Sequence, residues 1–457
     1  MPDLPKSAEY ITDGTTFVNP LGMAFTLVMC ILIVVLPRRH AWLPVILLMC
    51  YMTMGMRIMI ADLNFTMMRI LLFFGYVRIL ARQEYRRFRL TPIDKAMLWF
   101  TLSSIVTFTL LWQIYDAFKN KMGMAYTVLG FYFLARLLLR EWSDVVRVTK
   151  MTALCLVPLA VSVIFEKMTG TNCFAIFSGV PAITVVRMGV LRCQGPFAHP
   201  ILAGTFGATL LPTFLGLWFV GGRQRWFALV GIASCLTIVV CSASSGPMLA
   251  TGAAVVAWGM WFLRRQMQVV RWALVGAVAA LAMLMKAPVW YIMARMDVVS
   301  GSTGYHRAYL LDTACKHLSE WWLVGTKSTA AWDEILWDVT NQYLVLGTDG
   351  GLITLALFLV VLAQCFRGVG ISVRRFDTQR TRLFFWGLGA ALFAHVVSFM
   401  SIMYFDQNVV NFYTLLAVIS TLSAPFAMSR QRVPLLRQAA SAGREFEVPQ
   451  TAEAHFL

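Results

Sequence analysis

Residues 288–345 read PVWYIMARMDVVSGSTGYHRAYLLDTACKHLSEWWLVGTKSTAAWDEILWDVTNQYLV and form the longest segment between two long apolar runs. Ser302 and Thr303 offer a helix N-cap, and the following residues 304–322 have helical period. Apolar side chains recur at spacings of three and four, which places them on the same helix face as Arg307. These apolar residues are Leu311, Ala314, Leu318 and Trp321.

The opposite face of this predicted helix already has its own ion pairs. Asp312 pairs with Lys316 and Lys316 with Glu320, each at a spacing of four residues. Arg307 is therefore an additional cation that points towards the protein. An inward cation beside a bilayer needs an anionic partner or a polar cavity. The alternatives are a satisfied contact with a carboxylate or carbonyl, and a bound anionic substrate.

The composition predicts a helical membrane protein. Of 457 residues, 59% are hydrophobic and 13% are charged, whereas soluble domains carry about 25% charged residues. The apolar residues form runs long enough to cross a bilayer, which excludes the short alternating segments of a β-barrel. The predicted spans are 21–37, 41–56, 65–81, 96–114, 124–139, 150–166, 199–220, 226–244, 247–263, 272–288, 342–366, 383–405 and 408–427.

The fold expected from these runs is an all-α, polytopic transmembrane bundle of about 12–13 spans. The net charge of +17 does not indicate nucleic-acid binding, because the Lys and Arg residues cluster in alternate connections between spans. That pattern predicts an N-terminus on the outer side and a cytoplasmic C-terminus. The domains are a polar segment 1–20, a single transmembrane catalytic domain 21–437 and a disordered cytoplasmic tail 438–457. If spans 41–56 and 65–81 form a broken pair, the N-terminus could change sides.

Two larger loops, about 167–198 and 289–341, fall on the outer side in this count. They carry more positive charge than outer loops normally do, which a polyanion at the outer leaflet would explain. These cations are Arg187, Arg192, Arg295, Arg307, Lys316 and Lys327. Three further charged residues surround the start of the third span. They either pair with one another or line the same polar cavity as the loop cations. These residues are Arg57, Asp62 and Arg69.

The first loop ends with Arg187 and Arg192, shortly before a span begins at Pro200. On a helix, residues five apart point about 140° apart, so we expect only one, preferably Arg192, to face a common site. Arginine recognises phosphate bidentately, and arginines from two loops could clamp a diphosphate. Anchoring to lipid phosphate is the alternative. His199 is a candidate for lining the site or an ordinary interfacial histidine.

The second loop ends with polar residues that enter a span. Asp338 is a candidate general base or an N-cap, and Asn341 and Tyr343 are candidates for lining the site. Asp349 falls inside the predicted span, where a carboxylate is either functional or paired with an amide or arginine. Nine cysteines show no metal-binding spacing, so no metal is expected. A Cys173–Cys193 disulfide and free thiols both remain open.

Three stretches together resemble the O-antigen ligase and Wzy-type polymerase superfamily. The first runs from Arg192 through Gly195 to Pro200, and the second is the serine-rich turn 241–247. The third is the long loop, with Arg307 near its first helix, Leu323-Val-Gly-Thr behind that helix, and Asn341-Gln-Tyr-Leu before a Gly-Gly span.

The resemblance implies a multi-pass enzyme of the bacterial inner (cytoplasmic) membrane whose active site faces the periplasm. Such an enzyme transfers a glycan from undecaprenyl diphosphate to a sugar hydroxyl, without metal, nucleotide or other cofactor. The acceptor is another lipid-linked repeat in a polymerase, or lipid A–core in a ligase. The resemblance also implies that Arg192 and Arg307 bind the diphosphate. Expected partners are the lipid-linked oligosaccharide, a glycan or lipid acceptor, the bilayer and polysaccharide-assembly proteins, with no nucleic acid.

One position departs from the ligase pattern. Ligases typically have a histidine just before the Asn-x-Tyr-Leu stretch, and here that residue is Thr340, which cannot act as a base. Asp338 or His306 could take the catalytic role. The departure favours polymerisation of O-antigen or exopolysaccharide repeats over ligation. A transporter or flippase, and a non-catalytic assembly scaffold, are the remaining alternatives.

Overall fold

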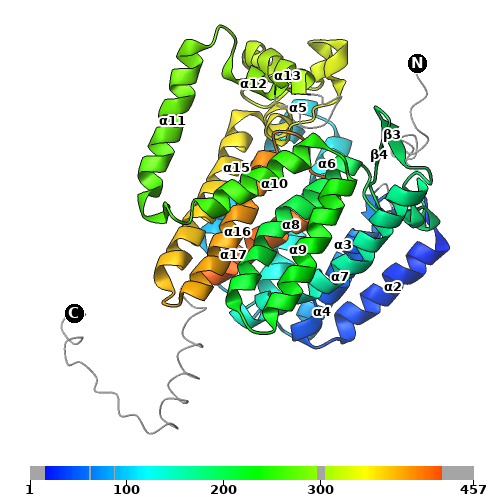
Figure 1. Ribbon diagram of the computed structural model, residues 1–457. Coiled ribbons are helices and arrows are strands. Elements are labelled where there is room, and N and C mark those ends of the chain that lie inside the picture. Colours follow the sequence, from blue (N-terminus) through cyan, green and yellow to red (C-terminus); the bar gives the residue numbers. More distant parts are fainter. Residues whose placement is uncertain (1–15, 61–62, 87, 296–303, 425–457) are drawn as a thin grey trace, which may run out of the picture.

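The structure is a computed structural model that describes residues 16–60, 63–86, 88–295 and 304–424. Most of the described chain is helical (Figure 1). The helices are α2 (Pro20–Val35), α3 (Leu43–Tyr51), α4 (Met67–Ala81), α5 (Pro92–Trp112), α6 (Tyr115–Leu138), α7 (Trp142–Thr169), α8 (Pro200–Val220), α9 (Gln224–Cys241), α10 (Ser245–Gly259), α11 (Met267–Leu284), α12 (Ile292–Arg295), α13 (Gly304–Lys316), α14 (Leu318–Trp321), α15 (Gln342–Arg375), α16 (Gln379–Ser398) and α17 (Gln407–Ser423).

Short 3-10 helices and two strand pairs complete the described elements. The 3-10 helices are η1 (Arg38–His40), η2 (Cys173–Phe177), η3 (Arg264–Gln266), η4 (Val289–Tyr291), η5 (Thr329–Ala331) and η6 (Glu334–Trp337). The antiparallel pairs are β1 (Arg57–Ile60) with β2 (Leu63–Thr66), and β3 (Val185–Arg187) with β4 (Val190–Arg192). The expected tail 438–457, most of the segment 1–20, and the N-cap candidates Ser302 and Thr303 lie outside the described residues.

Seven of the described helices are long and apolar enough to cross a membrane, so the chain is a multi-pass helical membrane protein. They are α5, α7, α8, α9, α11 together with η3, α15 and α16. The other expected spans coincide with helices that are shorter or more charged. Helix α2, for example, has 16 residues. Helix α11 stands apart from the bundle in Figure 1, and none of its apolar window is buried.

The expected span 41–56 is a broken helix. Helix α3 ends at Tyr51 after nine residues, about 14 Å of rise, which is too short to cross a bilayer core. The next residues are extended but buried, and the Gln407 side chain donates to the Met52 carbonyl over 3.0 Å. Non-helical backbone at this depth is stable where the protein supplies such partners. The strands β1 and β2 then replace the expected start of span 65–81.

Helix α8 is the central helix of the bundle and packs against α9, α10 and α16. Small residues allow this close approach: a Cβ on Gly204 would lie 2.7 Å from Pro247 on α10, and one on Gly216 would lie 3.1 Å from Phe384 on α16. Asn408 and Asn411 of α17 donate to Leu202 and Thr209 of α8, over 3.0 and 3.1 Å. These contacts fix the position from which α8 begins.

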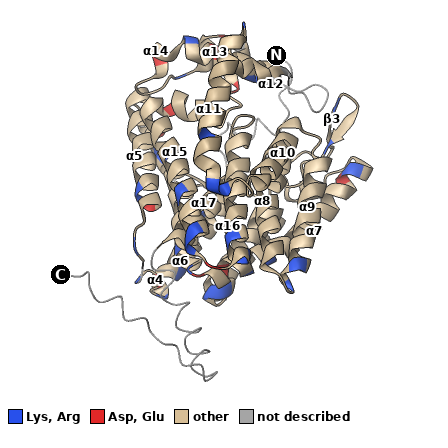
Figure 2. Cartoon of the chain, turned by 60° about the vertical axis from the view of Figure 1, so that its left-hand side comes forward, with Lys and Arg blue, Asp and Glu red and all other residues tan. Residues whose placement is uncertain are grey.

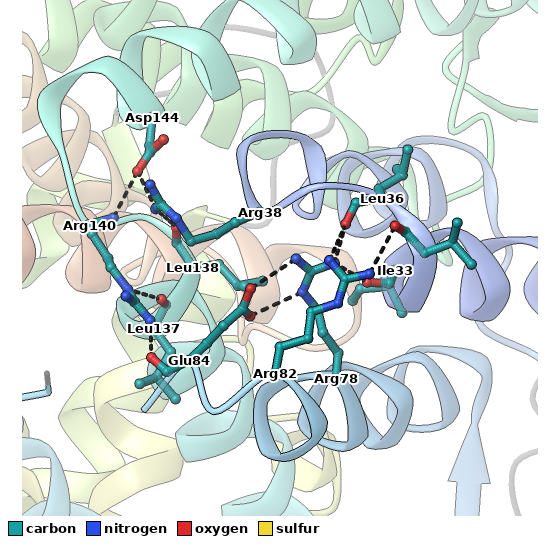
Figure 3. A network of polar contacts seen from close by, with 11 residues as sticks. Ile33, Leu36, Arg38, Arg78, Arg82, Glu84, Leu137, Leu138, Arg140 and Asp144 are labelled. Carbon is teal, nitrogen blue, oxygen red and sulfur yellow. Dashed lines mark hydrogen bonds and ion pairs between the residues drawn. The ribbon is translucent and has the colours of Figure 1, made fainter. Parts of the chain in front are cut away.

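A network of arginines ties the connections together at one end of the bundle (Figure 3). Arg78 is fully buried, pairs with both carboxylate oxygens of Glu84 and donates to carbonyls at the end of α2. Arg38 pairs with Asp144 over 2.6 Å. Many Lys and Arg residues lie towards this lower end in Figure 2, opposite α12, α13 and α14. This distribution agrees with the charge asymmetry noted in the sequence.

The second loop packs into a kink in α15. Gly351 has φ +70, and a Cβ there would lie 2.2 Å from the Leu323 carbonyl oxygen. The kink frees backbone groups, which bind the loop: Thr326 N–H donates to the Thr348 carbonyl, and Leu352 N–H donates to the Trp322 carbonyl. The two glycine-containing motifs of this region therefore form one contact, and they hold the loop against the end of the bundle.

The predicted helix 304–322 is divided in two. Helix α13 ends at Lys316, and α14 begins at Leu318. The Asp312–Lys316 ion pair forms, with a distance of 2.7 Å. Glu320 does not pair with Lys316 as expected, because the break redirects it to His317 at 2.7 Å and to the Trp332 indole.

Candidate functional site

The strands β3 and β4 place Arg187 and Arg192 on one face of a hairpin. Val185 is paired with Arg192, and Arg187 with Val190. Directly paired residues share a face, as do residues two apart along a strand. Both arginines therefore project to the same side. The expectation that only one of them could face a common site assumed a helix, and it is wrong because this stretch is extended.

Arg192 is buried and is held by the serine-rich turn between α9 and α10. Its Nη2 donates to Ser244 Oγ over 2.7 Å, and its side chain is 7% exposed. The backbone N–H of Cys193 donates to the Cys241 carbonyl over 3.1 Å. Two of the stretches that carry the family resemblance thus contact each other. The Arg192 Nε is buried and has no hydrogen-bond partner among the described residues, so this donor is left unsatisfied.

Glu166 positions the backbone that follows Arg192. This carboxylate, near the end of α7, accepts hydrogen bonds from the N–H groups of Gln194 and Gly195 and from Thr184 Oγ1, over 3.1, 2.8 and 3.2 Å. Gly195 has φ +56, which only glycine adopts readily. Sequence reasoning missed Glu166. Its signal was an acidic residue at the end of an apolar run.

Arg307 lies on the buried face of α13. Its residue is 8% exposed, its Nε has no hydrogen-bond partner, and no ion pair to it is found within residues 16–60, 63–86, 88–295 and 304–424. Burial and the charges of Arg187 and Arg192 lower the pKa of Arg307 to about 10. The three arginines, from β3, β4 and α13, therefore lie within range of one another's fields.

Three neighbouring cations with no carboxylate paired to them in the described chain form a positive cluster, named here the arginine cluster. A buried, unpaired guanidinium costs several kcal/mol of desolvation, and like charges repel. An anion with several oxygens would remove both penalties and satisfy the free Nε donors. The arrangement therefore favours binding of a polyanion such as a diphosphate. The side chain of Arg295, a fourth cation noted in the sequence, is outside the described part of the chain.

His199 is the N-cap of α8 and lies beside the arginine cluster. Its Nδ1 accepts a hydrogen bond from the Ile201 N–H over 3.2 Å, so the ring proton is on Nε2. The imidazole remains accessible, yet desolvation by the surrounding chain lowers its pKa to about 4, and the charges of Arg192, Arg187 and Arg307 lower it further. His199 is therefore a neutral hydrogen-bond donor beside the three arginines.

The two candidate bases lie together. Partial desolvation raises the pKa of Asp338, although its side chain is exposed, and His306 opposes this shift. The arginines perturb Arg307 and His199, but they are not among the charges that perturb Asp338. Asp338 therefore lies within range of the field of His306, which directly precedes Arg307 on α13.

The remaining candidates at the start of α15 are partly used for structural hydrogen bonds and partly without a hydrogen-bond partner in the described chain. Asn341, not Asp338, is the N-cap of α15, and it accepts from Tyr343 and Leu344 N–H groups over 2.9 and 3.2 Å. Its amide Nδ2 and the Thr340 hydroxyl are buried without a partner among the described residues. The Tyr343 hydroxyl donates to the Val396 carbonyl over 3.0 Å, which ties α15 to α16.

Asp349 does not lie with the arginine cluster. It pairs with Lys121 of α6 over 2.7 Å and lines a separate cavity with Arg69. Asp62 lies outside the described residues. All nine cysteines are free thiols, and the Cys173–Cys193 disulfide does not form: Cys173 is exposed and Cys193 is buried.

Comparisons with protein-family models and with curated protein sequences found no match to this chain.

Proposed function

We propose that this protein is a membrane-embedded glycosyltransferase that transfers a glycan from undecaprenyl diphosphate to a sugar hydroxyl at the periplasmic face of the inner membrane. The observation that carries the proposal is the arginine cluster: Arg187, Arg192 and Arg307 are close together, two of them are buried, and none has a paired carboxylate in the described chain. A lipid diphosphate fits both their charge and their position at the end of a membrane bundle.

The chemistry follows from those charges. The acceptor hydroxyl oxygen attacks the anomeric carbon, the bond from that carbon to the diphosphate oxygen breaks, and undecaprenyl diphosphate leaves with the electron pair. Negative charge grows on the diphosphate in the transition state, where the preorganised arginines stabilise it. His199 Nε2–H can donate a further hydrogen bond to the leaving group. The acceptor proton goes to Asp338, whose raised pKa makes it a better base than an ordinary aspartate.

Polymerisation of repeat units is the favoured reaction, and ligation to lipid A–core is the alternative. Thr340 occupies the position where ligases carry histidine, and its hydroxyl cannot accept a proton near neutral pH. A transporter or flippase is expected to carry its charges along a path through the spans, whereas the arginine cluster lies on β3, β4 and α13, outside the long apolar helices.

The test is a carbohydrate gel of cells that lack the gene and are complemented with wild type, Arg307→Ala or Lys316→Ala. Lys316 is the matched control, because it lies on the same helix, is exposed and pairs with Asp312. We expect Arg307→Ala to abolish the product at normal protein level, and Lys316→Ala to leave it unchanged.

The products in the deletion strain separate the reactions. Collapse of a long ladder to a single lipid-linked repeat identifies a polymerase. Long polymer that stays on undecaprenyl diphosphate and is absent from lipid A–core identifies a ligase. An unchanged profile with Arg307→Ala at wild-type protein level contradicts the proposal and favours a transporter or scaffold.

A further inference from the structure

A second polar site lies away from the arginine cluster. A partly open cavity of about 400 Å³ is lined by α4, α5, α6, α15, α17 and the segment that leads into α17. None of the three clustered arginines lines it. Small-molecule sites typically occupy ~300–1,000 Å³ and combine apolar walls with a few polar groups. The cavity therefore has the size of a ligand site rather than of a packing defect.

Four charged side chains from four segments line this cavity. Lys121 of α6 is 5% exposed, forms the 2.7 Å ion pair with Asp349 of α15, and lies 4.1 Å from the centre of the Phe108 ring. Arg69 of α4 donates from Nε to Thr127 Oγ1 over 2.9 Å. Asp406, just before α17, completes the set. Lys121 and Asp349 neutralise each other, and the charge of Arg69 is opposed in part by Asp406, so the cavity does not favour a strongly charged ligand.

Asp406 is the least satisfied of these groups. It has φ +57, a backbone conformation that is strained for a residue other than glycine. Its carboxyl makes no hydrogen bond or ion pair within the described part of the chain, and Arg69 acts on it only through its field. Burial raises the pKa of Asp406 to about 7, which Arg69 opposes. A strained carboxyl without a partner on a cavity wall can accept a hydrogen bond from a ligand.

Aliphatic side chains and several aromatic rings form most of the rest of the wall. The rings include Phe100, Phe108, Phe358, Phe399, Tyr404 and Phe412. A sugar ring matches this mixture, since it carries C–H groups on its faces and hydroxyls at its edge. The aromatic rings can cover the faces of the sugar. The charged side chains can donate hydrogen bonds to its hydroxyls and accept hydrogen bonds from them. A prenyl or acyl chain would leave the carboxyl of Asp406 without a hydrogen-bond partner, which costs free energy.

We propose that this cavity is a binding site for a neutral, mono- or disaccharide-sized part of the acceptor glycan, with Asp406, Asp349 and Lys121 bonding its hydroxyls. The proposal rests on the proposed glycosyltransferase function and places acceptor recognition beyond the arginine cluster. Gln342 lines the cavity and directly follows Asn341, the N-cap of α15. The start of α15 therefore adjoins the cavity.

The experiment measures protection of a cysteine placed in the cavity of the purified full-length protein. Cys173 and Cys315, the two exposed cysteines, are first changed to serine. Ser104→Cys then reports from inside the cavity, and Asn120→Cys reports from its exposed rim, where folding is unaffected. The probe is the oligosaccharide repeat released by mild acid from the lipid-diphosphate-linked precursor of the host cell. We expect this oligosaccharide to slow the maleimide labelling of the cysteine at position 104 several-fold. The additional substitution Asp406→Ala should remove this protection.

Pyrophosphate separates this proposal from the proposed function. It should bind the arginine cluster without slowing the labelling of either cysteine. Unchanged labelling with the oligosaccharide at both positions, in protein that still binds pyrophosphate, overturns the cavity proposal and leaves the arginine cluster standing. Protection by the oligosaccharide in protein that does not bind pyrophosphate supports the cavity and overturns the diphosphate assignment.

Discussion

His199 shows how single residues near the arginine cluster depend on its occupancy. Burial and three positive charges hold the pKa of this imidazole at about 4, against about 6.5 in water. A bound polyanion would cancel the field of the arginines. The pKa of His199 should then rise towards its ordinary value, because the charged form is no longer opposed.

The sign of the resulting pH dependence follows from linkage. If the bound form has the higher pKa, proton uptake favours binding, so affinity for pyrophosphate increases as pH falls from about 6.5 towards 4. Each unit of pKa rise contributes up to about tenfold in affinity. Calorimetric titrations of wild type and His199→Asn at several pH values measure this, and the ratio of the two affinities removes the titration of pyrophosphate itself. A ratio that is constant with pH contradicts this role.

At the scale of elements, the β3–β4 hairpin and the start of α8 form one unit that α7 supports. Lys167 donates to the Leu191 carbonyl, and Glu166 accepts from the backbone just beyond Arg192. The β3–β4 hairpin is short and much of it is exposed, so its own strand pairing cannot fix the position of the hairpin. We infer that the end of α7 sets where Arg192 lies.

Glu166→Gln tests this support without changing side-chain volume. The amide group would set a donor against one of the backbone N–H donors, which costs about 1–3 kcal/mol for an unsatisfied buried group. We expect a lower temperature of unfolding in detergent and weaker pyrophosphate binding, although Glu166 does not contact the ligand site. Asp116→Asn is the control, since that carboxyl is 79% exposed. Equal stability and affinity in the Glu166 variant and wild type would show that the hairpin is held elsewhere.

For the whole molecule, the predicted orientation is open to a direct measurement. Cys173, in η2 of the first loop, and Cys315, in α13 of the second, are exposed, whereas the other seven cysteines are buried. Both loops should face the periplasm, because the Lys- and Arg-rich connections lie at the other end of the bundle.

A membrane-impermeant maleimide should therefore label both native cysteines in intact spheroplasts. Arg223→Cys, made in a protein that lacks the two exposed thiols, lies in the turn between α8 and α9 and should react only after the membrane is opened. If Cys173 or Cys315 is labelled only after permeabilisation, the predicted orientation is wrong and the site does not face the periplasm.

The sequence by itself determined the class of protein and the places of the long apolar helices, and it named Arg187, Arg192 and Arg307 as candidates for binding an anion. Apolar runs of membrane length and charged connections are local properties, so they can be recognised without knowing which helices touch. Arg307 could be assigned to the inner face of its helix for the same reason, because helical period is local.

Only the tertiary structure decided which charges meet. It brought Arg187 and Arg192 to one face, because the stretch pairs as a hairpin rather than coiling as a helix. It placed Asp349 with Lys121, whose sequence separation of 228 residues leaves no local signal. It also revealed Glu166 as a support and Asp406 as a cavity carboxyl, since burial and partners of a side chain depend on packing between distant segments.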